Sequence, residues 1–169
     1  MSITFSSDNG KISEEDIREA SRLCETYFNT QKDPSQIQTS LENDKWIYGH
    51  IKNYVNLIRN DEELIGYTLM IPCTISLMND FLKKTINEAE LFESIKQLNP
   101  PSPTAIYLCD SFVKENYRKK GLATTVLIKT LTPFLTTKPV LFYYKYSEEG
   151  ERLVKKVAQE LKFQLKTRR

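Results

Sequence analysis

The stretch that determines the fold of this chain is Asp110-Ser-Phe-Val-Lys-Glu-Asn-Tyr-Arg-Lys-Lys-Gly-Leu-Ala-Thr-Thr-Val-Leu-Ile-Lys-Thr130. The residues from Ala105 to Val113 are mostly apolar and aromatic, which is typical of a buried β-strand. After Gly121 the apolar side chains recur at roughly helical spacing, at Leu122, Val126, Ile128 and Leu131. The stretch therefore predicts a strand, a short basic turn and the start of a helix.

The turn between these two elements has the properties of an anion-binding site. Gly121 lets the backbone approach a ligand closely or adopt a conformation that a Cβ would resist. The first amides of the helix have no partners inside the helix, and the helix dipole makes this end attractive to anions. Because Arg118, Lys119 and Lys120 precede the helix, the turn predicts a cradle for a diphosphate. An ordinary basic turn between a strand and a helix is the alternative.

The run from Val113 to Ala123 resembles the acetyl-coenzyme A signature of the GCN5-related N-acetyltransferase (GNAT) superfamily. The signature is R/Q-x-x-G-x-G/A, set five residues after a Val that closes a strand, and Arg118, Gly121 and Ala123 occupy its fixed positions. The resemblance implies an α/β (α+β) fold with a mixed, mostly antiparallel central sheet, helices on both faces, and splayed fourth and fifth strands. It also implies a single N-acetyltransferase domain over residues 1–169.

The resemblance further implies acetyl-coenzyme A (acetyl-CoA) as co-substrate. In this family the pantetheine arm lies between the splayed strands, against backbone groups that match Ser111, Phe112 and Val113 here. The pyrophosphate lies against the turn and helix start, which match Arg118, Lys119, Lys120, Gly121, Leu122, Ala123 and Thr124. The implied function is transfer of an acetyl group to an amine by direct attack. The alternative is a non-catalytic acetyl-CoA-binding sensor or interaction module of the same fold.

Two departures from the family pattern bear on the catalytic groups. The family often has a Glu six residues before the Val, and this catalytic position is Tyr107 here. Asp110 is the only carboxylate in the strand, so we expect it to be the base or the amine anchor, with a cap at the strand edge as the alternative. The tyrosine that the family often places in its last helix is absent. Tyr144 and Tyr146, at the end of the fifth strand, are therefore candidate acids for the departing thiolate.

Composition and charge exclude several other classes of function. The 169 residues suit one domain with a core of its own, and 40% hydrophobic and 27% charged residues are an ordinary balance. The net charge of +2 is too small to favour nucleic acid as a partner. No run of about 18 apolar residues and no signal peptide occurs, so we expect a cytoplasmic protein without a membrane partner. The three cysteines, Cys24, Cys73 and Cys109, form no metal or disulfide pattern.

The remaining patterns predict the other elements in order. We expect a strand at 3–5, helices at 14–29 (with Ser13 as N-cap) and about 34–43, a hairpin of strands at 53–59 and 64–74, a cofactor helix at about 121–134, a fifth strand at 140–146, a last helix from 147 and a short strand at 163–165. Trp46, Tyr48 and His50 are expected near a turn at Gly49.

A helical insertion is predicted at about 76–100, with Asn79 or Asp80 as its cap. It is either a packed side helix, a lid over the acceptor site or a dimer contact. The family often has one more strand, so we expect the sheet to be truncated or to be completed by a partner chain in a homodimer. The acceptor is a small-molecule amine or a peptide amine, and no feature of the sequence chooses between them.

Overall fold

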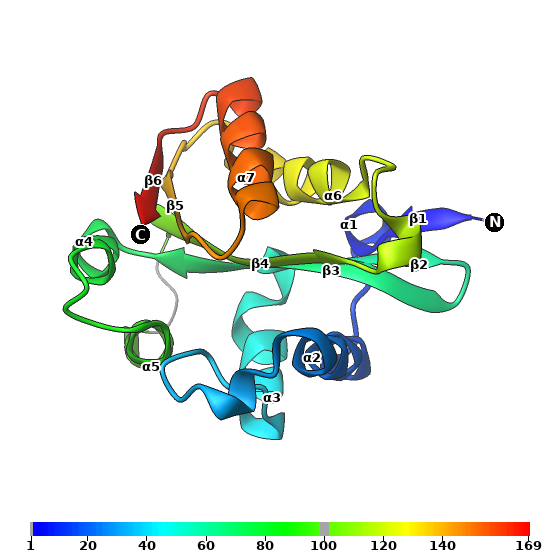
Figure 1. Cartoon of the computed structure of the whole chain (residues 1–169), viewed down its shortest axis with the longest axis horizontal. Coiled ribbons are helices and arrows are strands. Elements are labelled where there is room, and N and C mark those ends of the chain that lie inside the picture. Colours follow the sequence, from blue (N-terminus) through cyan, green and yellow to red (C-terminus); the bar gives the residue numbers. More distant parts are fainter. Residues whose placement is uncertain (1, 99–101) are drawn as a thin grey trace.

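A computed structural model describes residues 2–98 and 102–169 and shows one six-stranded sheet in the order β1-β2-β3-β4-β5-β6 (Figure 1). The strands are β1 (Ile3–Phe5), β2 (Val55–Asn60), β3 (Glu63–Cys73), β4 (Ala105–Val113), β5 (Val140–Tyr144) and β6 (Leu165–Arg168). Neighbours from β1 to β4 are antiparallel, whereas β5 runs parallel to both β4 and β6. The predicted mixed, mostly antiparallel sheet is confirmed.

Helices cover both faces of the sheet (Figure 1). The α2 face carries α2 (Glu14–Phe28), α3 (Leu41–Ile51), α4 (Ile75–Leu82) and α5 (Glu88–Leu98), and the α7 face carries α1 (Ser6–Asn9), α6 (Leu122–Leu131) and α7 (Glu148–Leu161). Four 3-10 turns join these elements: η1 (Thr30–Lys32), η2 (Lys52–Tyr54), η3 (Glu115–Tyr117) and η4 (Thr132–Phe134). Among the described residues, no helix has the length and apolar character that a bilayer span needs.

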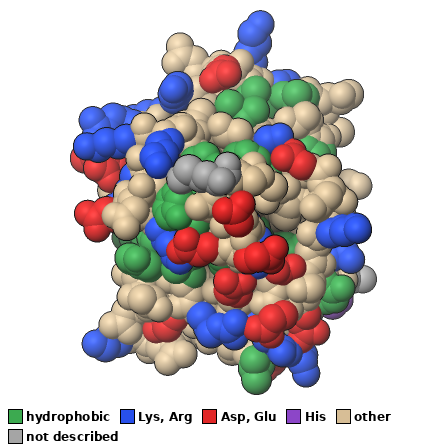
Figure 2. Space-filling view, turned by 90° about the vertical axis from the view of Figure 1, so that its right-hand side faces the viewer, with side chains coloured by type: hydrophobic (Ala, Val, Ile, Leu, Met, Phe, Trp, Pro, Cys, Tyr) green, Lys and Arg blue, Asp and Glu red, His purple; other side chains and the backbone are tan. Residues whose placement is uncertain are grey.

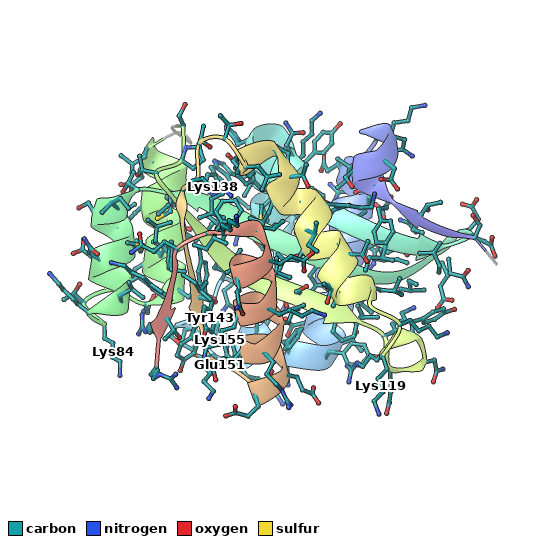
Figure 3. The ribbon with its side chains drawn as sticks, turned by 90° about the horizontal axis from the view of Figure 1, so that it is seen from above. Lys84, Lys119, Lys138, Tyr143, Glu151 and Lys155 are labelled. Carbon is teal, nitrogen blue, oxygen red and sulfur yellow. The ribbon has the colours of Figure 1, made fainter. Side chains whose placement is uncertain are left out.

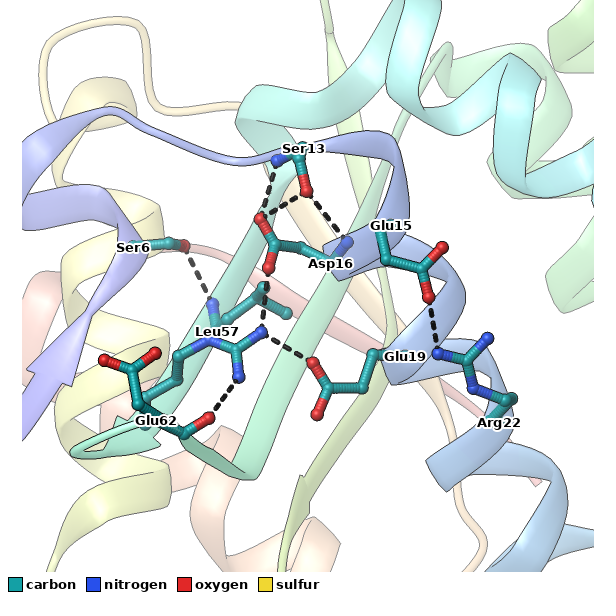
Figure 4. A network of polar contacts seen from close by, with 9 residues as sticks. Ser6, Ser13, Glu15, Asp16, Glu19, Arg22, Leu57 and Glu62 are labelled. Atoms are coloured by element: carbon teal, nitrogen blue, oxygen red, sulfur yellow. Dashed lines mark hydrogen bonds and ion pairs between the residues drawn. The ribbon is translucent and has the colours of Figure 1, made fainter.

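The start of α2 is fixed by a reciprocal cap between Ser13 and Asp16 (Figure 4). The Ser13 hydroxyl accepts from the Asp16 N–H at 3.1 Å, and the Asp16 carboxylate accepts from the Ser13 N–H at 2.7 Å. Asp16 and Glu19 both pair with the guanidinium of Arg59 on β2, at 2.8 and 2.7 Å. The cap predicted at Ser13 is confirmed, and it ties α2 to the sheet.

Charged side chains of both signs lie next to one another on the face that carries the β2–β3 turn (Figure 2). Besides Arg59, this region pairs Lys114 with Glu63 at 2.8 Å. Acidic and basic side chains are thus interspersed around the β2–β3 turn.

Strands β4 and β5 separate partway along the sheet. They pair only at Ala105–Tyr107 of β4, opposite Val140–Phe142 of β5. Beyond this point β4 continues to Val113, whereas β5 ends at Tyr144. The predicted splay of the fourth and fifth strands is therefore present.

A β-bulge in β4 determines which helices its side chains face. Leu69 of β3 lies opposite Asp110 and Met70 lies opposite Leu108, so Cys109 is an extra residue. Strict alternation would place Asp110 on the α7 face together with Leu108. The extra residue turns Asp110 to the α2 face, where its carboxylate accepts a hydrogen bond from the Tyr67 hydroxyl.

The helix predicted at about 34–43 is wrong, because the effective cap lies further along the chain. Ser40 accepts from the Asn43 N–H at 3.1 Å, and α3 runs from Leu41 to Ile51. The Asp33 carboxylate instead accepts from the Ser35 N–H at 3.0 Å in a local turn. Consequently Gly49 lies inside α3, and the expected turn at this residue is also wrong.

The predicted helical insertion, whose residues 99 and 100 lie outside the described residues, forms two helices. Thr74, rather than Asn79 or Asp80, caps α4 by accepting from the Leu77 N–H at 3.2 Å. Lys84, with a φ of 65°, ends this helix, and the Asn87 side chain accepts from the Glu90 N–H at 2.9 Å to open α5. This second helix places Glu88 against β4.

Candidate functional site

A cavity of about 420 Å³ lies where β4 and β5 separate. On the α2 face it is lined by α2, the loop at 30–39, α3 and the first turn of α5, and on the α7 face by residues of α6 and α7. Because residues from both faces line it, the cavity passes through the sheet between the two strands.

The turn before α6 is held at the end of β4, where Arg118 Nε donates to the Val113 carbonyl at 2.8 Å. Gly121 has a φ of +75° and is the N-cap of α6, and no described side chain caps this helix start. A Cβ built on Gly121 would meet no heavy atom within 4 Å, so the space in front of the turn is open. The amides of Leu122 to Thr124 therefore open a helix without side-chain partners, beside a basic turn that includes Lys119 and Lys120 (Lys119 is labelled in Figure 3).

Backbone groups of β4 point into the opening. The Lys114 N–H donates to the Ile65 carbonyl of β3 at 2.8 Å. Since backbone groups of an antiparallel strand alternate between its two sides, those of Val113 and Ser111 are directed away from β3. The Val113 carbonyl accepts from Arg118 Nε at 2.8 Å, and the buried Ser111 hydroxyl has no partner among the described residues.

The Phe112 side chain packs against the end of α2 on the α2 face. Its ring lies 4.4 Å from that of Tyr27 and 5.9 Å from that of Phe28, and the Arg118 guanidinium lies 5.8 Å from it. Of these residues, Tyr27 and Phe28 line the cavity. The end of α2 thus forms an aromatic wall beside the predicted cofactor turn.

Asp110 lines the cavity on the α2 face. Its carboxylate accepts from the Tyr67 hydroxyl, and Cys24 of α2 lies against it. Burial raises the pKa of Asp110 from its ordinary 3.8 to about 6, although the hydrogen bond from Tyr67 opposes the shift. A carboxylate with this pKa is ionised at neutral pH and still basic enough to take up a proton.

The structure places Tyr107 in the core rather than in the cavity lining. Its side chain is fully buried, and its hydroxyl donates to Glu88 Oε1 at 2.5 Å. Glu88 also accepts from the Ile37 N–H at 3.1 Å, and burial raises the pKa of Glu88. Tyr107, at the position where the family often has Glu, therefore anchors Glu88 of α5, and the Glu88 carboxylate lines the cavity.

The predicted acids Tyr144 and Tyr146 both line the cavity, with ring centroids 4.7 Å apart. Tyr143 precedes them in the same stretch, but strand alternation points it to the α7 face. There its hydroxyl donates to Glu151 Oε1 of α7 at 3.1 Å, and it too lines the cavity (Figure 3). Sequence reasoning missed Tyr143 and Glu88, since neither stands in the signature or at a position that the family uses.

Comparisons with known proteins relate this geometry to a fold. No family model and no curated protein sequence matches the chain. Among solved structures it is similar to Arabidopsis thaliana NAA60 in complex with acetyl-CoA, at 17% identity and a TM-score of 0.53, with 93% of this chain and 86% of that chain covered. It is also similar to arylalkylamine N-acetyltransferase 2 from Aedes aegypti, at 15% identity and a TM-score of 0.54, with 93% of this chain and 82% of that chain covered. The chain has the GNAT fold.

Within this GNAT fold, the turn that carries the signature opens α6, and the splayed strands are β4 and β5. The resemblance stated from Arg118, Gly121 and Ala123 is confirmed for the fold. The chain also spans 57% of the length of diaminobutyrate acetyltransferase EctA from Paenibacillus lautus, at 9% identity and a TM-score of 0.46, with 77% of this chain covered.

Proposed function

We propose that this chain is an acetyl-CoA-dependent N-acetyltransferase that acts on an amine by direct attack. The supporting observation is the separation of β4 and β5 beside the uncapped start of α6, with one cavity reaching both faces of the sheet. A protein of the same fold, NAA60, is known in complex with acetyl-CoA. We further propose that residues 1–169 act as one domain.

The residues present fit acetyl-CoA. The partnerless hydroxyl of Ser111 and the outward backbone groups of Val113 would bind a polar arm that lies between the strands. The amides of 121–124 and the cations Lys119 and Lys120 would hold the pyrophosphate. The open space at Gly121 would let the phosphates approach the backbone.

The proposed reaction transfers the acetyl group without a covalent acetyl-enzyme. Bound acetyl-CoA supplies a thioester; the amine nitrogen forms a bond to its carbonyl carbon as the carbon–sulfur bond breaks. Asp110 anchors the amine and accepts the proton that the nitrogen loses. Backbone N–H groups of β4 that face the opening stabilise the charge on the carbonyl oxygen.

The departing thiolate takes up a proton to leave as coenzyme A. Tyr143, Tyr144 and Tyr146 line the cavity and are the candidate donors. A phenol can protonate a thiolate when it is positioned beside the sulfur, and burial raises the pKa of Tyr146, which makes it a weaker acid than a free phenol. Replacing each by Phe and comparing single-turnover rates identifies the donor.

Calorimetric titration of acetyl-CoA tests the cofactor site. We expect binding on the order of micromolar for the wild-type chain and none for Gly121→Glu, which places an anion where the pyrophosphate would lie. Gly121→Asn is the matched control, because Asn tolerates a positive φ and adds no charge. Absence of binding by the wild-type chain would refute the proposal. Binding without turnover across an amine panel would favour the non-catalytic module.

A further inference from the structure

The described lining of the cavity contains carboxylates and no cationic side chain. The carboxylates are those of Asp44, Glu88, Asp110 and Glu151, and the described lining includes no Lys, Arg or His. The whole chain has 24 Lys and Arg against 22 Asp and Glu, so composition does not explain this selection. The cavity is therefore suited to a cationic ligand.

Asp44, Glu88 and Asp110 are held in place without an ion pair among the described residues. Asp44 accepts from the Ser21 hydroxyl, and the charges of Arg18 and Arg22 act on it. Glu88 accepts from the Tyr107 hydroxyl and the Ile37 N–H, and Asp110 accepts from the Tyr67 hydroxyl. None of the three forms an ion pair with a described Lys or Arg, whereas Glu151 pairs with Lys145, Lys155 and Arg169.

The charge of Arg168 reaches Glu88, but its guanidinium donates to the carbonyl oxygens of Phe81 and Ile86, at 3.2 and 2.7 Å. A half-buried carboxylate without a counter-ion is costly, and an ammonium group bound beside it removes that cost.

The walls between these acids are aromatic. Tyr27, Phe28, Tyr144 and Tyr146 line the cavity, yet 51, 47, 38 and 57% of their respective surfaces remain exposed. Such rings can cover an alkyl chain and attract an ammonium group to their faces. The volume of about 420 Å³ lies in the range of small-molecule sites.

We propose that the acceptor is an alkyl diamine without a carboxylate, whose reacting amine lies at Asp110 and whose second ammonium group lies at Glu88. The assignment of the reacting end rests on the proposed acetyltransferase function, whereas binding of the diamine does not. An amino acid would bring its own carboxylate into a cavity whose described lining offers no cation to it, so this class of acceptor is disfavoured.

Binding of three small amines at about pH 8 tests the inference. The probes are 1,5-diaminopentane, 1-aminopentane, which lacks the second charge, and 5-aminopentanoate, which replaces it by a carboxylate. We expect calorimetry to show the diamine bound at least about tenfold more tightly than the monoamine, and the amino acid more weakly than either. Equal affinities of the diamine and the monoamine for the wild-type chain would overturn the inference.

The variant Glu88→Gln tests whether Glu88 causes the tighter binding of the diamine. It keeps an oxygen that can accept from Tyr107, and we expect it to lower the diamine affinity about tenfold while the monoamine is unaffected. Glu93→Gln is the matched control, since Glu93 lies on the same helix, outside this cavity, and pairs with Lys96. An unchanged preference in Glu88→Gln would refute the role of Glu88.

Acetylation is then measured separately with acetyl-CoA. A diamine preference in binding without any acetylation would refute the proposed function and leave the diamine site standing. If the monoamine and the diamine bound with equal affinity and were acetylated with equal efficiency, the diamine site would be refuted and the proposed function would stand. The three-ligand comparison uses the wild-type chain alone, so it tests the diamine site even if Glu88→Gln does not fold.

Discussion

Replacement of Asp110 by Asn should make the protein more stable at neutral pH while removing the proposed acetyltransferase activity. Asn has nearly the same shape and keeps an oxygen that can accept from Tyr67, so the change removes mainly the charge. The pKa of Asp110 is about 6 in the folded chain, against an ordinary 3.8. Each pKa unit corresponds to about 1.36 kcal/mol, so the shift is worth up to about 3 kcal/mol.

The sign of the change in unfolding free energy depends on whether the folded or the unfolded state binds the Asp110 proton more tightly. The raised pKa means that the folded state binds this proton better than the unfolded state does. The stabilising contribution is therefore complete below the unfolded pKa and is lost as the pH rises through about 6. Relative to the wild type, Asp110→Asn should gain up to about 3 kcal/mol of unfolding free energy between about pH 4 and pH 7.

Urea denaturation at several pH values across this range measures the difference in unfolding free energy. Asp61→Asn is the control, because it makes the same chemical change at an exposed turn where the side chain accepts from the Ser2 N–H. A difference between Asp110→Asn and wild type that is independent of pH, or that shrinks as pH rises, would refute the reasoning. Turnover should fall on the order of 10²- to 10⁴-fold with acetyl-CoA affinity unchanged.

Three further changes probe the supporting structure. Gly66→Ala places a Cβ 2.6 Å from the Phe112 carbonyl oxygen, so thermal denaturation should show a loss of about 1–3 kcal/mol, and acetyl-CoA affinity should fall as β4 shifts. Ser40→Ala removes the cap of α3 and should cost about 1 kcal/mol in urea denaturation with acetyl-CoA affinity unchanged. Tyr107→Phe removes one of the two donors to Glu88 and leaves the Ile37 N–H; it should cost about 1–3 kcal/mol of unfolding free energy and weaken diamine binding in calorimetry. If neither the stability nor the diamine affinity changed, the Tyr107–Glu88 contact would be contradicted.

Sequence patterns predicted correctly the elements whose structure depends on contacts between residues that are close together in the chain. The Ser13–Asp16 cap, the β2–β3 hairpin and the turn before α6 each depend on residues within a few positions of one another. The start of α3 was misplaced because Asp33 and Ser40 are both acceptable caps. The choice depends on packing, since the segment from 41 to 51 brings Ile47 and Ile51 into the core.

The site was less accessible from sequence because its parts meet over long distances. Asp110, which lines the cavity, was a candidate because it is the only carboxylate in its strand. Glu88 was missed because its contact with Tyr107 joins residues 19 positions apart, and an acid in the first turn of a helix is ordinarily a surface residue. No pattern in the sequence marks the bulge at Cys109, which depends on the register between β3 and β4.

That bulge links the fold to the proposed chemistry. Without the extra residue, Asp110 would face α7, on the opposite side of the sheet from Tyr67 and Glu88. With it, two carboxylates lie on one face of the sheet, and the charge of Glu88 helps to raise the pKa of Asp110. The negative charge of each carboxylate is unfavourable for the fold, because each is partly buried without an ion pair among the described residues. Given the proposed role of Asp110 as base or amine anchor, Asp110→Asn should therefore lower activity and raise stability.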